Sequence, residues 1–514
     1  MLLLLIAAGA LAFRWQHLER RPFHADEGVQ AVKAGELYDS GRYIYNPVEF
    51  HGPSLYYFTL PLLKLSGAKD FAAASDASFR LVPVLFGAGL ILLLLPLRRD
   101  LGNVAMLTAA VLTAVSPAMV FFSRYYIQEM LLVFFAALAL CALWRYFRVP
   151  SRRWLVLLGL AGGLMYATKK TSVICYGALA AAYGTILVRR RCRDGQPLWP
   201  MSRADARRVM LTAGVAATVG VLFYSSFLAN WRGPLDSLLA FRHYVGRSGG
   251  DGSAALHQHP WYYYLKMLCY TKDAPGPWWS EGLIVALAAI GLGASARGRM
   301  HPVIHPELAL FLAVYTLCMI VIYALIPYKT PWNMLGFLHG LILMAGIGAS
   351  WIFHRSPRLA WRTMVLVLLS LGAGQLAAQA IRANYRFCAD PRNPYVYAHS
   401  VPDVVRLAQR INELAAVHAD GTSMRIHCIT PDYWPLPYYL RKLPQTGYWN
   451  TIPAAADAPV IVASAALQDP LEPLLLDRYH TEFYGLRPGV LLVLNIQQDL
   501  WDRYLQHQAP AATR

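Results

Sequence analysis

The sequence predicts an all-α polytopic membrane protein with about eleven transmembrane helices, followed by a small α/β domain outside the membrane. The 514 residues are 56% hydrophobic and only 15% charged, whereas soluble domains are about 25% charged. Apolar runs long enough to cross a bilayer recur along the first two-thirds of the chain. The remainder is polar and has the short apolar patterns of a soluble domain.

The expected spans are the apolar runs that approach or exceed the thickness of the hydrocarbon core. They are 2–18, 79–97, 103–121, 130–147, 153–168, 171–188, 208–228, 279–296, 307–326, 332–353 and 361–381. The first run lacks a basic leader and a small-residue cleavage site, so it is predicted to be a span and not a cleaved signal. Either Arg14 and His17 snorkel to the membrane surface, or the chain lacks a few residues at its start.

The distribution of Lys and Arg sets the predicted orientation. One set of alternate short loops carries nearly all of the basic residues, which places that set in the cytoplasm. The other set carries only Arg124, Lys169, Lys170 and Lys329. The protein is therefore predicted to be a multi-pass protein of the cytoplasmic (inner) membrane. Its predicted parts are a transmembrane domain, 1–381, with outer loops 19–78 and 229–278, and an extracytoplasmic α/β domain, 382–514.

Within the C-terminal region, apolar runs at 424–429, 460–463 and 490–496 indicate strands, and 404–417 has the spacing of an amphipathic helix. Cys388 and Cys428 also lie in this region. Outside the cell they could form a disulfide, and two free buried thiols are an equal alternative.

The net charge of +18 is explained by this topology, because most of the basic residues lie in short loops between apolar runs. The sequence shows neither a basic stripe with interleaved aromatic residues nor a zinc-type Cys/His spacing. Nucleic acid is therefore excluded as a predicted partner, and the bilayer is retained.

Ionisable groups at the membrane edge are candidates for function, because charge is costly at membrane depth. The segment His24-Ala25-Asp26-Glu27-Gly28 follows the first span. Its adjacent carboxylates suit a general base or a metal ligand. The alternative is that Asp26 and Glu27 form the acidic first turn of a helix that runs through Leu37.

Two further outer segments combine aromatic and charged residues. His51, Tyr56 and Tyr57 suit the wall of a sugar pocket, or an interfacial aromatic anchor. Glu129 opens an apolar run and needs a partner, and Arg124 is the expected one, either in a site or in a plain structural ion pair.

Cations also occupy tight outer turns. Lys169 and Lys170 are predicted to bind phosphate, or to snorkel to lipid headgroups. Lys329 and Trp332 form a similar pair in a later turn. In the second outer loop, the glycine-rich stretch 246–252 suggests a substrate lid, or an ordinary flexible loop.

Carboxylates, cations and aromatic residues on one face are what sugar transfer from a lipid phosphate requires. A base must deprotonate the acceptor hydroxyl, and cations must stabilise the departing phosphate. The cations expected to hold the lipid phosphate are Lys169, Lys170, Arg124 and Lys329. Asp26 and Glu129 could also hold a divalent cation, Mg²⁺ or Mn²⁺. The alternatives are a lipid-linked-sugar flippase, or a flippase-associated transport component, and a non-catalytic scaffold.

Five segments occur along the chain in the same order as in a known family. They are the acidic residue Asp26, the Pro-x-Leu-Tyr-Tyr segment from Pro53, the Arg-Leu-x-Pro segment from Arg80, the acidic residue Glu129 and the pair Thr168-Lys169. In these segments the chain resembles the GT-C superfamily of polytopic glycosyltransferases, and is similar to protein O-mannosyltransferase and lipid A aminoarabinose transferase relatives. The closest resemblance is to an uncharacterised family with a His-Ala-Asp-Glu-Gly motif, some members of which are named flippase activity-associated proteins.

This resemblance implies a hexosyltransferase that uses a polyprenyl-phosphate-linked donor and an acceptor hydroxyl on a protein, lipid or glycan. It implies that Asp26 is the base, with Glu27 and Glu129 as catalytic partners, and that Arg80 lies among the substrate-binding residues. The chain departs from the aminoarabinose-transferase relatives where they carry Lys-Pro-Pro, because it has His51-Gly52-Pro53. Its second acid is Glu, where relatives often have Asp.

Overall fold

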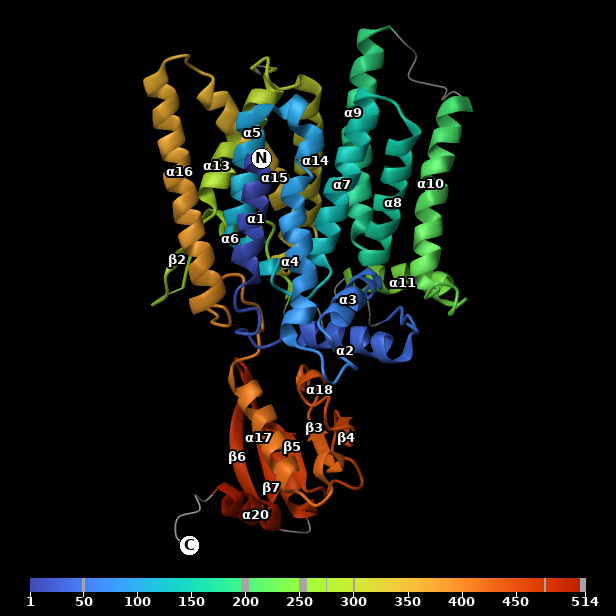
Figure 1. Ribbon diagram of the computed structural model, residues 1–514, viewed down its shortest axis with the longest axis vertical. Helices are drawn as coiled ribbons and strands as arrows, with labels where there is room; N and C mark the ends of the chain where they lie inside the picture. Colours follow the sequence, from blue (N-terminus) through green and yellow to red (C-terminus); the bar gives the residue numbers. More distant parts are fainter. Residues whose placement is uncertain are drawn as a thin grey trace.

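The computed structural model describes residues 1–48, 51–195, 203–248, 257–273, 275–298, 301–475 and 478–508, with the side chains at 203 and 242–248 outside that description. Two parts are evident, a bundle of long helices and a smaller sheet domain at one end of it (Figure 1). The N-terminal helix, α1, belongs to the bundle.

A helix coincides with each expected span. The helices are α1 (Leu2–Trp15), α4 (Asp76–Leu92), α5 (Arg98–Val115), α7 (Glu129–Arg148), α8 (Arg152–Thr168), α9 (Ser172–Arg193), α10 (Arg203–Tyr224), α13 (Gly282–Ala296), α14 (Pro306–Leu325), α15 (Leu335–Phe353) and α16 (Leu359–Ile381). Within the described residues, seven helical segments are long and apolar enough to span a membrane, one of them running through both α4 and α5. The α1 and α13 helices are shorter and apolar. The polytopic, mainly helical architecture is therefore confirmed.

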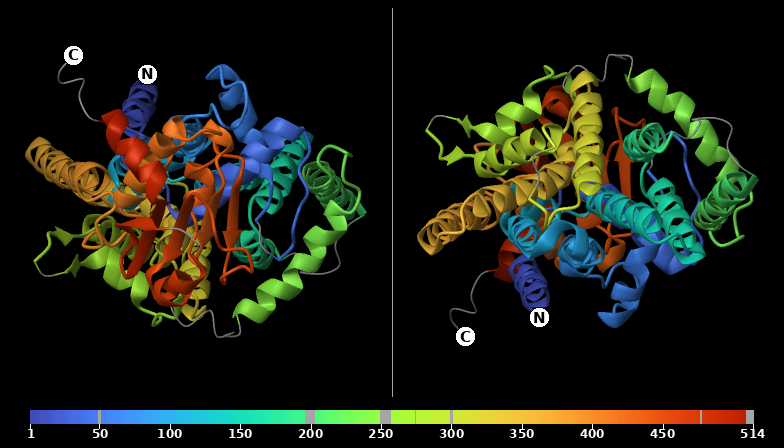
Figure 2. Two further views of the ribbon diagram at one scale, coloured as in Figure 1. Left: turned by 90° about the horizontal axis from the view of Figure 1, so that it is seen from below. Right: turned by 90° about the horizontal axis from the view of Figure 1, so that it is seen from above.

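The helices are not equally buried. We compare the most apolar 18-residue stretch of each membrane-spanning segment. The buried share of this stretch is 83% for the segment that contains α15, 72% for α7 and only 6% for α10. The α10 helix accordingly lies at the edge of the bundle in both views of Figure 2. Among the described residues, α10 therefore leaves most of its apolar surface exposed.

The described parts of both predicted outer loops lie at the end of the bundle that faces the sheet domain (Figure 1). The first loop forms α2 (Ala25–Ser40) and α3 (Ser54–Leu65). The second forms α11 (Gly233–Ser248), α12 (Tyr263–Cys269) and a ribbon of β1 (Thr271–Lys272) and β2 (Trp278–Trp279). A short helix, α6 (Pro117–Phe122), precedes α7 at the same end.

The C-terminal domain contains a five-stranded sheet in the order β4-β3-β5-β7-β6. The strands are β3 (Ile426–Ile429), β4 (Thr446–Trp449), β5 (Val460–Ser464), β6 (Tyr479–Arg487) and β7 (Val490–Gln497). Strands β4, β3 and β5 are parallel, β7 pairs antiparallel with β5, and β6 pairs antiparallel with β7 and forms the edge. The helices are α17 (Asp403–Val417), α18 (Leu436–Tyr439), α19 (Gln468–Leu471) and α20 (Gln498–Gln508). The three predicted strands and the predicted helix are all present.

Sequence periodicity explains the core of this domain. Leu407, Ile411 and Leu414 of α17 are fully buried, as their spacing predicted. Strands β4 and β6 were not predicted, because β4 is short and only half-buried and β6 has many polar residues. Cys428 is buried in β3 and, like Cys388, is a free cysteine, so the disulfide alternative is wrong.

Helix α18 joins the two parts. Tyr438 donates a hydrogen bond to Asp76 Oδ1 at 2.6 Å, and the Phe23 N–H donates to the Tyr439 hydroxyl at 2.7 Å. A Cβ at Gly28 would lie 2.7 Å from the Cβ of Pro435. Only glycine therefore allows the sheet domain to approach α2 this closely.

Glycines also explain how α10 is held. A Cβ at Gly163 of α8 would lie 2.6 Å from Val219 Cβ and 2.7 Å from the Ala216 carbonyl oxygen. Gly159, one turn earlier, meets α10 in the same way, with the Thr212 carbonyl oxygen 2.7 Å from its Cβ position. This Gly-x-x-x-Gly pair brings the two backbones together, as small residues do in membrane helix pairs.

We expect Gly163→Ala to lower the free energy of unfolding by about 1–3 kcal/mol, because the added methyl group meets backbone as well as side chain. Gly177→Ala on α9 is the matched control, since nothing lies within 4 Å of its Cβ position. Thermal unfolding of the protein in detergent micelles measures both. Equal melting temperatures for the two variants would contradict the close α8–α10 packing.

Candidate active site

The first turn of α2 presents one carboxylate to the outside. His24 caps the helix, because its Nδ1 accepts the Asp26 N–H at 3.0 Å. The Asp26 side chain keeps 48% of its surface exposed, whereas His24 is buried. The predicted alternative, an acidic first helical turn, is therefore also correct as a description of the backbone. Its cap leaves the Asp26 carboxylate available to a ligand.

Glu27 points the opposite way and is fully buried. Its Oε1 accepts hydrogen bonds from Arg80 Nε at 2.8 Å and from the Tyr126 N–H at 2.9 Å. Its Oε2 accepts from Arg80 Nη2 at 2.8 Å and from the His24 N–H at 3.2 Å. Burial alone would raise the pKa of Glu27, but the charges of Arg80 and Arg21 lower it. The carboxylate is therefore ionised and fully engaged.

This pairing corrects two predicted roles. Both oxygens of Glu27 are occupied by hydrogen bonds, so we reassign it from a catalytic group to a structural anchor. Arg80 is 1% exposed and binds Glu27 and the carbonyl oxygens of Leu18 and Arg21, so it is a positioning residue and not a substrate ligand.

Arg124 and Arg14 are also structural. Arg124 donates to the carbonyl oxygens of Arg14, Gln16 and His17, where α1 ends. Arg14 is fully buried and donates to the Thr113 and Ala114 carbonyl oxygens and to Ser123 Oγ. The predictions that Arg124 binds phosphate or pairs with Glu129, and that Arg14 snorkels, are therefore wrong. Both arginines satisfy free carbonyl groups at helix ends.

Glu129 instead pairs with Lys169, which comes from the turn between α8 and α9. Asn333 Oδ1 lies 3.5 Å from Lys169 Nζ. These side chains and Trp332 line a small cavity of about 20 Å³, which is enough for one water molecule. The predicted acid and the predicted lysine are thus brought together, with the predicted tryptophan beside them.

Trp332 and Tyr125 connect this cavity to α2. The Trp332 ring lies 6.0 Å from the His24 ring and 5.7 Å from the Tyr125 ring. Burial raises the pKa of Tyr125, and the charges of Asp26, Glu27 and Glu129 raise it further. Tyr125 therefore lies within electrostatic reach of all three predicted carboxylates.

Lys170 has a different environment from Lys169. It is 1% exposed, and its Nζ has no hydrogen-bond partner in the described part of the chain. Its Nζ lies 4.3 Å from the ring centres of Tyr166 and Tyr224, with Phe241 at 5.3 Å and Tyr45 at 5.5 Å. Burial lowers the pKa of Lys170 to about 7. This aromatic cage is a cation site without an anion.

The remaining predicted residues support these segments. Tyr56 is fully buried and donates to Gln30 Oε1 at 2.6 Å, and Tyr57 donates to Ser226 Oγ at 2.7 Å. Lys329 is buried and its Nζ donates to the Ile326 carbonyl oxygen. His51 is half-buried beside Gly52, whose N–H donates to the Thr168 carbonyl oxygen at 3.0 Å.

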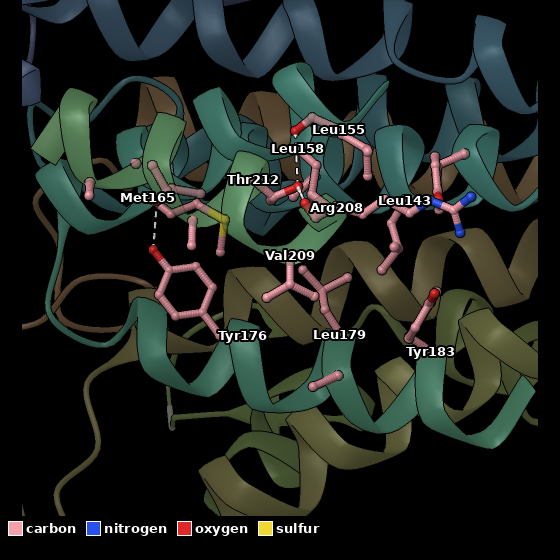
Figure 3. Close-up of a pocket in the computed structure, with 18 of the residues that line it drawn as sticks. Leu143, Leu155, Leu158, Met165, Tyr176, Leu179, Tyr183, Arg208, Val209 and Thr212 are labelled. Atoms are coloured by element: carbon pink, nitrogen blue, oxygen red, sulfur yellow. Dashed lines mark hydrogen bonds between the residues drawn. The ribbon is translucent and has the colours of Figure 1, made fainter. Parts of the chain in front are cut away.

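A groove of about 1040 Å³ runs between α8, α9 and α10. Its walls are mainly apolar, and Figure 3 shows Val209 of α10 and Leu179 of α9 pointing into it from opposite sides. Tyr166, near the C-terminal end of α8, lines the groove and also contacts Lys170. The groove therefore has the shape and chemistry of a site for a long apolar chain, with the caged lysine at one end.

Some neighbours of Asp26 were not predicted. His399 and Tyr397 reach the site from the linker before the C-terminal domain, and His257 hydrogen-bonds the Tyr397 hydroxyl at 2.6 Å. The charge of Asp26 acts on His257, although burial is the main cause of its lowered pKa. The glycine-rich stretch 246–252, the predicted lid, lies outside the described residues from 249 onward.

The chain matches known proteins both in sequence and in fold. The family model described as dolichyl-phosphate-mannose-protein mannosyltransferase matches residues 51–200. The chain is similar to ArnT from Cupriavidus metallidurans bound to undecaprenyl phosphate, with 16% identity and a TM-score of 0.64 over 97% of this chain and 98% of that one. The family match at 51–200 supports a membrane glycosyltransferase, and the likeness to ArnT shows a shared fold.

Another solved structure shows the same fold. The oligosaccharyltransferase of Archaeoglobus fulgidus is 12% identical, with a TM-score of 0.58 over 98% of this chain and 76% of that one. The search of curated proteins finds no match. The fold thus rests on matches along nearly the whole chain, and the glycosyltransferase class on the family match at 51–200.

A metal site in this protein stays a prediction. Among the described residues, no group of three or more His, Cys, Asp and Glu side chains is arranged to hold a metal ion. Glu129, one of the two predicted ligands, is paired with Lys169. A divalent cation at Asp26 and Glu129 would have to displace that lysine.

We expect Glu27→Gln to destabilise the protein by about 3–5 kcal/mol, because it leaves the Arg80 charge buried without its partner. Glu36→Gln, on the exposed side of the same helix, should change stability by less than about 0.5 kcal/mol. Unfolding in detergent at neutral pH measures both changes in stability. Because the pKa of Glu27 is lowered in the folded protein, the stability that its charge contributes is fully present at neutral pH and is lost only in acid. A Glu27 variant as stable as the wild type would contradict the anchor.

Proposed function

We propose that this enzyme transfers a sugar from a polyprenyl-phosphate-linked donor to an acceptor hydroxyl, with inversion, at the outer face of the membrane. The observation that carries the proposal is the Asp26 carboxylate, which is exposed on a helical turn capped by His24. The His24 ring lies 6.0 Å from the ring of Trp332, which lines the cavity that also holds Glu129 and Lys169. A base in this position can take the proton of an acceptor hydroxyl as that oxygen attacks the sugar carbon.

The donor lipid is assigned to the groove between α8, α9 and α10. Its volume and apolar lining suit a polyprenyl tail. Lys170 is the cation nearest the outer end of this groove, and it has no anion partner in the described structure. Binding the donor phosphate would require the side chain to leave its aromatic cage, and the ion pair formed would offset the lost cation–π contacts.

The second catalytic group of the proposal is Glu129. Its pair with Lys169 places opposite charges beside Trp332, whose ring is suited to stacking on a sugar. We assign Lys169 and Glu129 to orienting the sugar and its phosphate, and Asp26 to the proton transfer. Structural similarity to ArnT with bound undecaprenyl phosphate supports a lipid-linked donor.

The flippase alternative is less well supported. A flippase must carry an ionised headgroup through the hydrocarbon region, where an unpaired charge is costly. The groove between α8, α9 and α10 has mainly apolar walls along its middle, so it would hold a tail but would not hydrate a headgroup. This chemistry favours the transferase.

We expect Asp26→Asn to reduce transfer by at least about 10²-fold, because the amide cannot accept the acceptor's proton. The measurement is sugar transfer by purified protein in lipid vesicles, with polyprenyl-phosphate sugars extracted from the native membrane as donors. Glu36→Gln on the same helix is the control and should retain wild-type turnover. Full turnover by Asp26→Asn would remove this residue from the mechanism.

Replacing Lys170 tests the donor site separately. We expect Lys170→Met to weaken binding of undecaprenyl phosphate about tenfold or more, because one charge-assisted hydrogen bond is lost. Binding of undecaprenol, which lacks the phosphate, should not change. Lys64→Met, at the exposed end of α3, is the control. Equal affinities of the Lys170 and Lys64 variants for undecaprenyl phosphate would contradict the assignment.

A further inference from the structure

The groove between α8, α9 and α10 is nearly as long as the helices that form it. On α10 its lining runs from Asp205 to Val221, which is about 24 Å of helix. The hydrocarbon core of a bilayer is about 30 Å thick. The groove therefore extends from α11 to the opposite end of the bundle, away from the sheet domain (Figure 1). We call this opposite end the far end of the groove, and the distribution of basic residues predicts that it faces the cytoplasm.

The far end differs chemically from the rest of the groove. Among the described residues, all charged side chains that line the groove lie here, and they are Arg190, Arg191, Asp205 and Arg208. Three arginines and one carboxylate give the far end a positive charge. Tyr183 also lines it and lies within electrostatic reach of the charges on both α9 and α10. The groove thus joins a basic end to mainly apolar walls.

The arginines of the far end are not equally engaged. Arg190 Nε donates to both carboxylate oxygens of Glu307 on α14, at 3.0 and 3.1 Å, and the guanidinium lies 4.6 Å from the Phe147 ring centre. Arg190 is therefore a structural link between helices. Arg208 pairs with Asp205 one turn away on α10, and these side chains are 50% and 35% exposed. An exposed pair of this kind adds little stability, so an outside anion can take the place of Asp205 at small cost.

The apolar walls indicate an anion that carries a chain. A soluble anion would contact the arginines alone and leave the rest of the groove unused. Val209, one residue beyond Arg208, lines the groove and is 58% exposed, and only 6% of the most apolar stretch of α10 is buried. In a bilayer, lipid chains are the molecules that meet such a surface. Charge and apolar surface are thus arranged as they are in a lipid, with the charge at one end.

We propose that the far end of the groove binds an anionic phospholipid of the cytoplasmic leaflet. Its phosphate would lie at Arg191 and Arg208, and an acyl chain would lie between α8, α9 and α10. Basic pockets between transmembrane helices on the cytoplasmic side suit such headgroups, and the guanidinium group binds phosphate oxygens through two N–H donors. A zwitterionic lipid brings its own cation to the same place, so it should bind less tightly. This site goes beyond the proposed transfer reaction and does not depend on the donor assignment at Lys170.

The test is lipid binding by the full-length, delipidated protein in detergent micelles, measured by native mass spectrometry. The probes are dioleoyl-phosphatidylglycerol, dioleoyl-phosphatidylcholine and glycerol 3-phosphate. We expect phosphatidylglycerol to bind at least about tenfold more tightly than phosphatidylcholine, because two arginines near the membrane surface favour its net charge. Equal affinities for the two lipids would overturn the proposal. Glycerol 3-phosphate binding as tightly as phosphatidylglycerol would also overturn it, because the apolar groove would then contribute nothing.

Matched variants locate the headgroup. The double variant Arg191→Gln, Arg208→Gln should raise the dissociation constant of phosphatidylglycerol about tenfold or more. The control is Arg193→Gln, Arg207→Gln, which removes the same charge from the same two helices at residues that do not line the groove. The control should bind phosphatidylglycerol as the wild type does. Equal affinities of the two double variants would show that the attraction is not confined to the far end, and the proposal would fail.

A second pair of variants locates the acyl chain. Val209→Trp places a large ring in the groove next to Arg208 and should weaken phosphatidylglycerol binding about tenfold. Met210→Trp is the control, because Met210 is 72% exposed and does not line the groove. Melting temperatures without added lipid show whether the variants fold. Wild-type affinity in the Val209 variant would remove the chain from the groove and overturn the proposal.

These measurements separate the far-end site from the donor site. Lys170→Met should leave phosphatidylglycerol binding unchanged, because Lys170 lies in its aromatic cage with Tyr166 and Phe241 at the other end of the groove. If phosphatidylglycerol binds as expected and Lys170→Met does not weaken undecaprenyl phosphate binding, the donor assignment fails and the far-end site remains. If Lys170→Met weakens undecaprenyl phosphate binding and the two phospholipids bind equally, only the far-end site fails.

Discussion

The buried pair of Glu27 and Arg80 is the contact on which the site depends. Arg80 belongs to α4, and besides Glu27 it binds the carbonyl oxygens of Leu18 and Arg21, so the chain between α1 and α2 wraps around one guanidinium. Glu27 in turn accepts the Tyr126 N–H, which fixes the turn before α7. One ion pair thus holds the first outer helix, the end of the first span and the segment with Tyr125 together. An isolated charge of either sign would be unstable at this depth, so the two residues hold each other in place.

The helix geometry explains why neighbouring residues of the His-Ala-Asp-Glu-Gly segment do different work. Successive side chains on a helix point about 100° apart, so Asp26 and Glu27 cannot share a face. His24 caps the turn, Asp26 faces outward, Glu27 faces the bundle, and Gly28 contacts Pro435 of the sheet domain. Two carboxylates that are adjacent in the sequence are therefore not a catalytic pair. The outward one is the chemical candidate, and the inward one gives it a fixed position.

Much of the fold could be predicted because long apolar runs and apolar spacing are local signals. The helix at every expected span and the Leu407, Ile411 and Leu414 face of α17 follow from them. Which charged residues pair with each other is not determined by the local sequence. Glu129 was expected to pair with Arg124 because they are near in sequence, but α7 begins facing the turn that carries Lys169, while Arg124 turns back to the end of α1. His399 gave no signal at all, since only the path of the linker brings it to Tyr125.

The turn between α8 and α9 couples the two halves of the proposed site. Lys169 has extended backbone angles, with φ −153° and ψ 142°, and in an extended chain successive side chains point to opposite sides. Lys169 therefore enters the cavity with Glu129, and Lys170 enters the aromatic cage beside the groove. The turn itself cannot shift freely, because the Gly52 N–H and Ser54 Oγ hydrogen-bond Thr168. If a lipid phosphate draws Lys170 from its aromatic cage, the movement would also act on Lys169, because the two lysines are adjacent in one turn. Lys169 is the residue that pairs with Glu129. The positions of the donor tail and of the reacting sugar are linked through two adjacent residues.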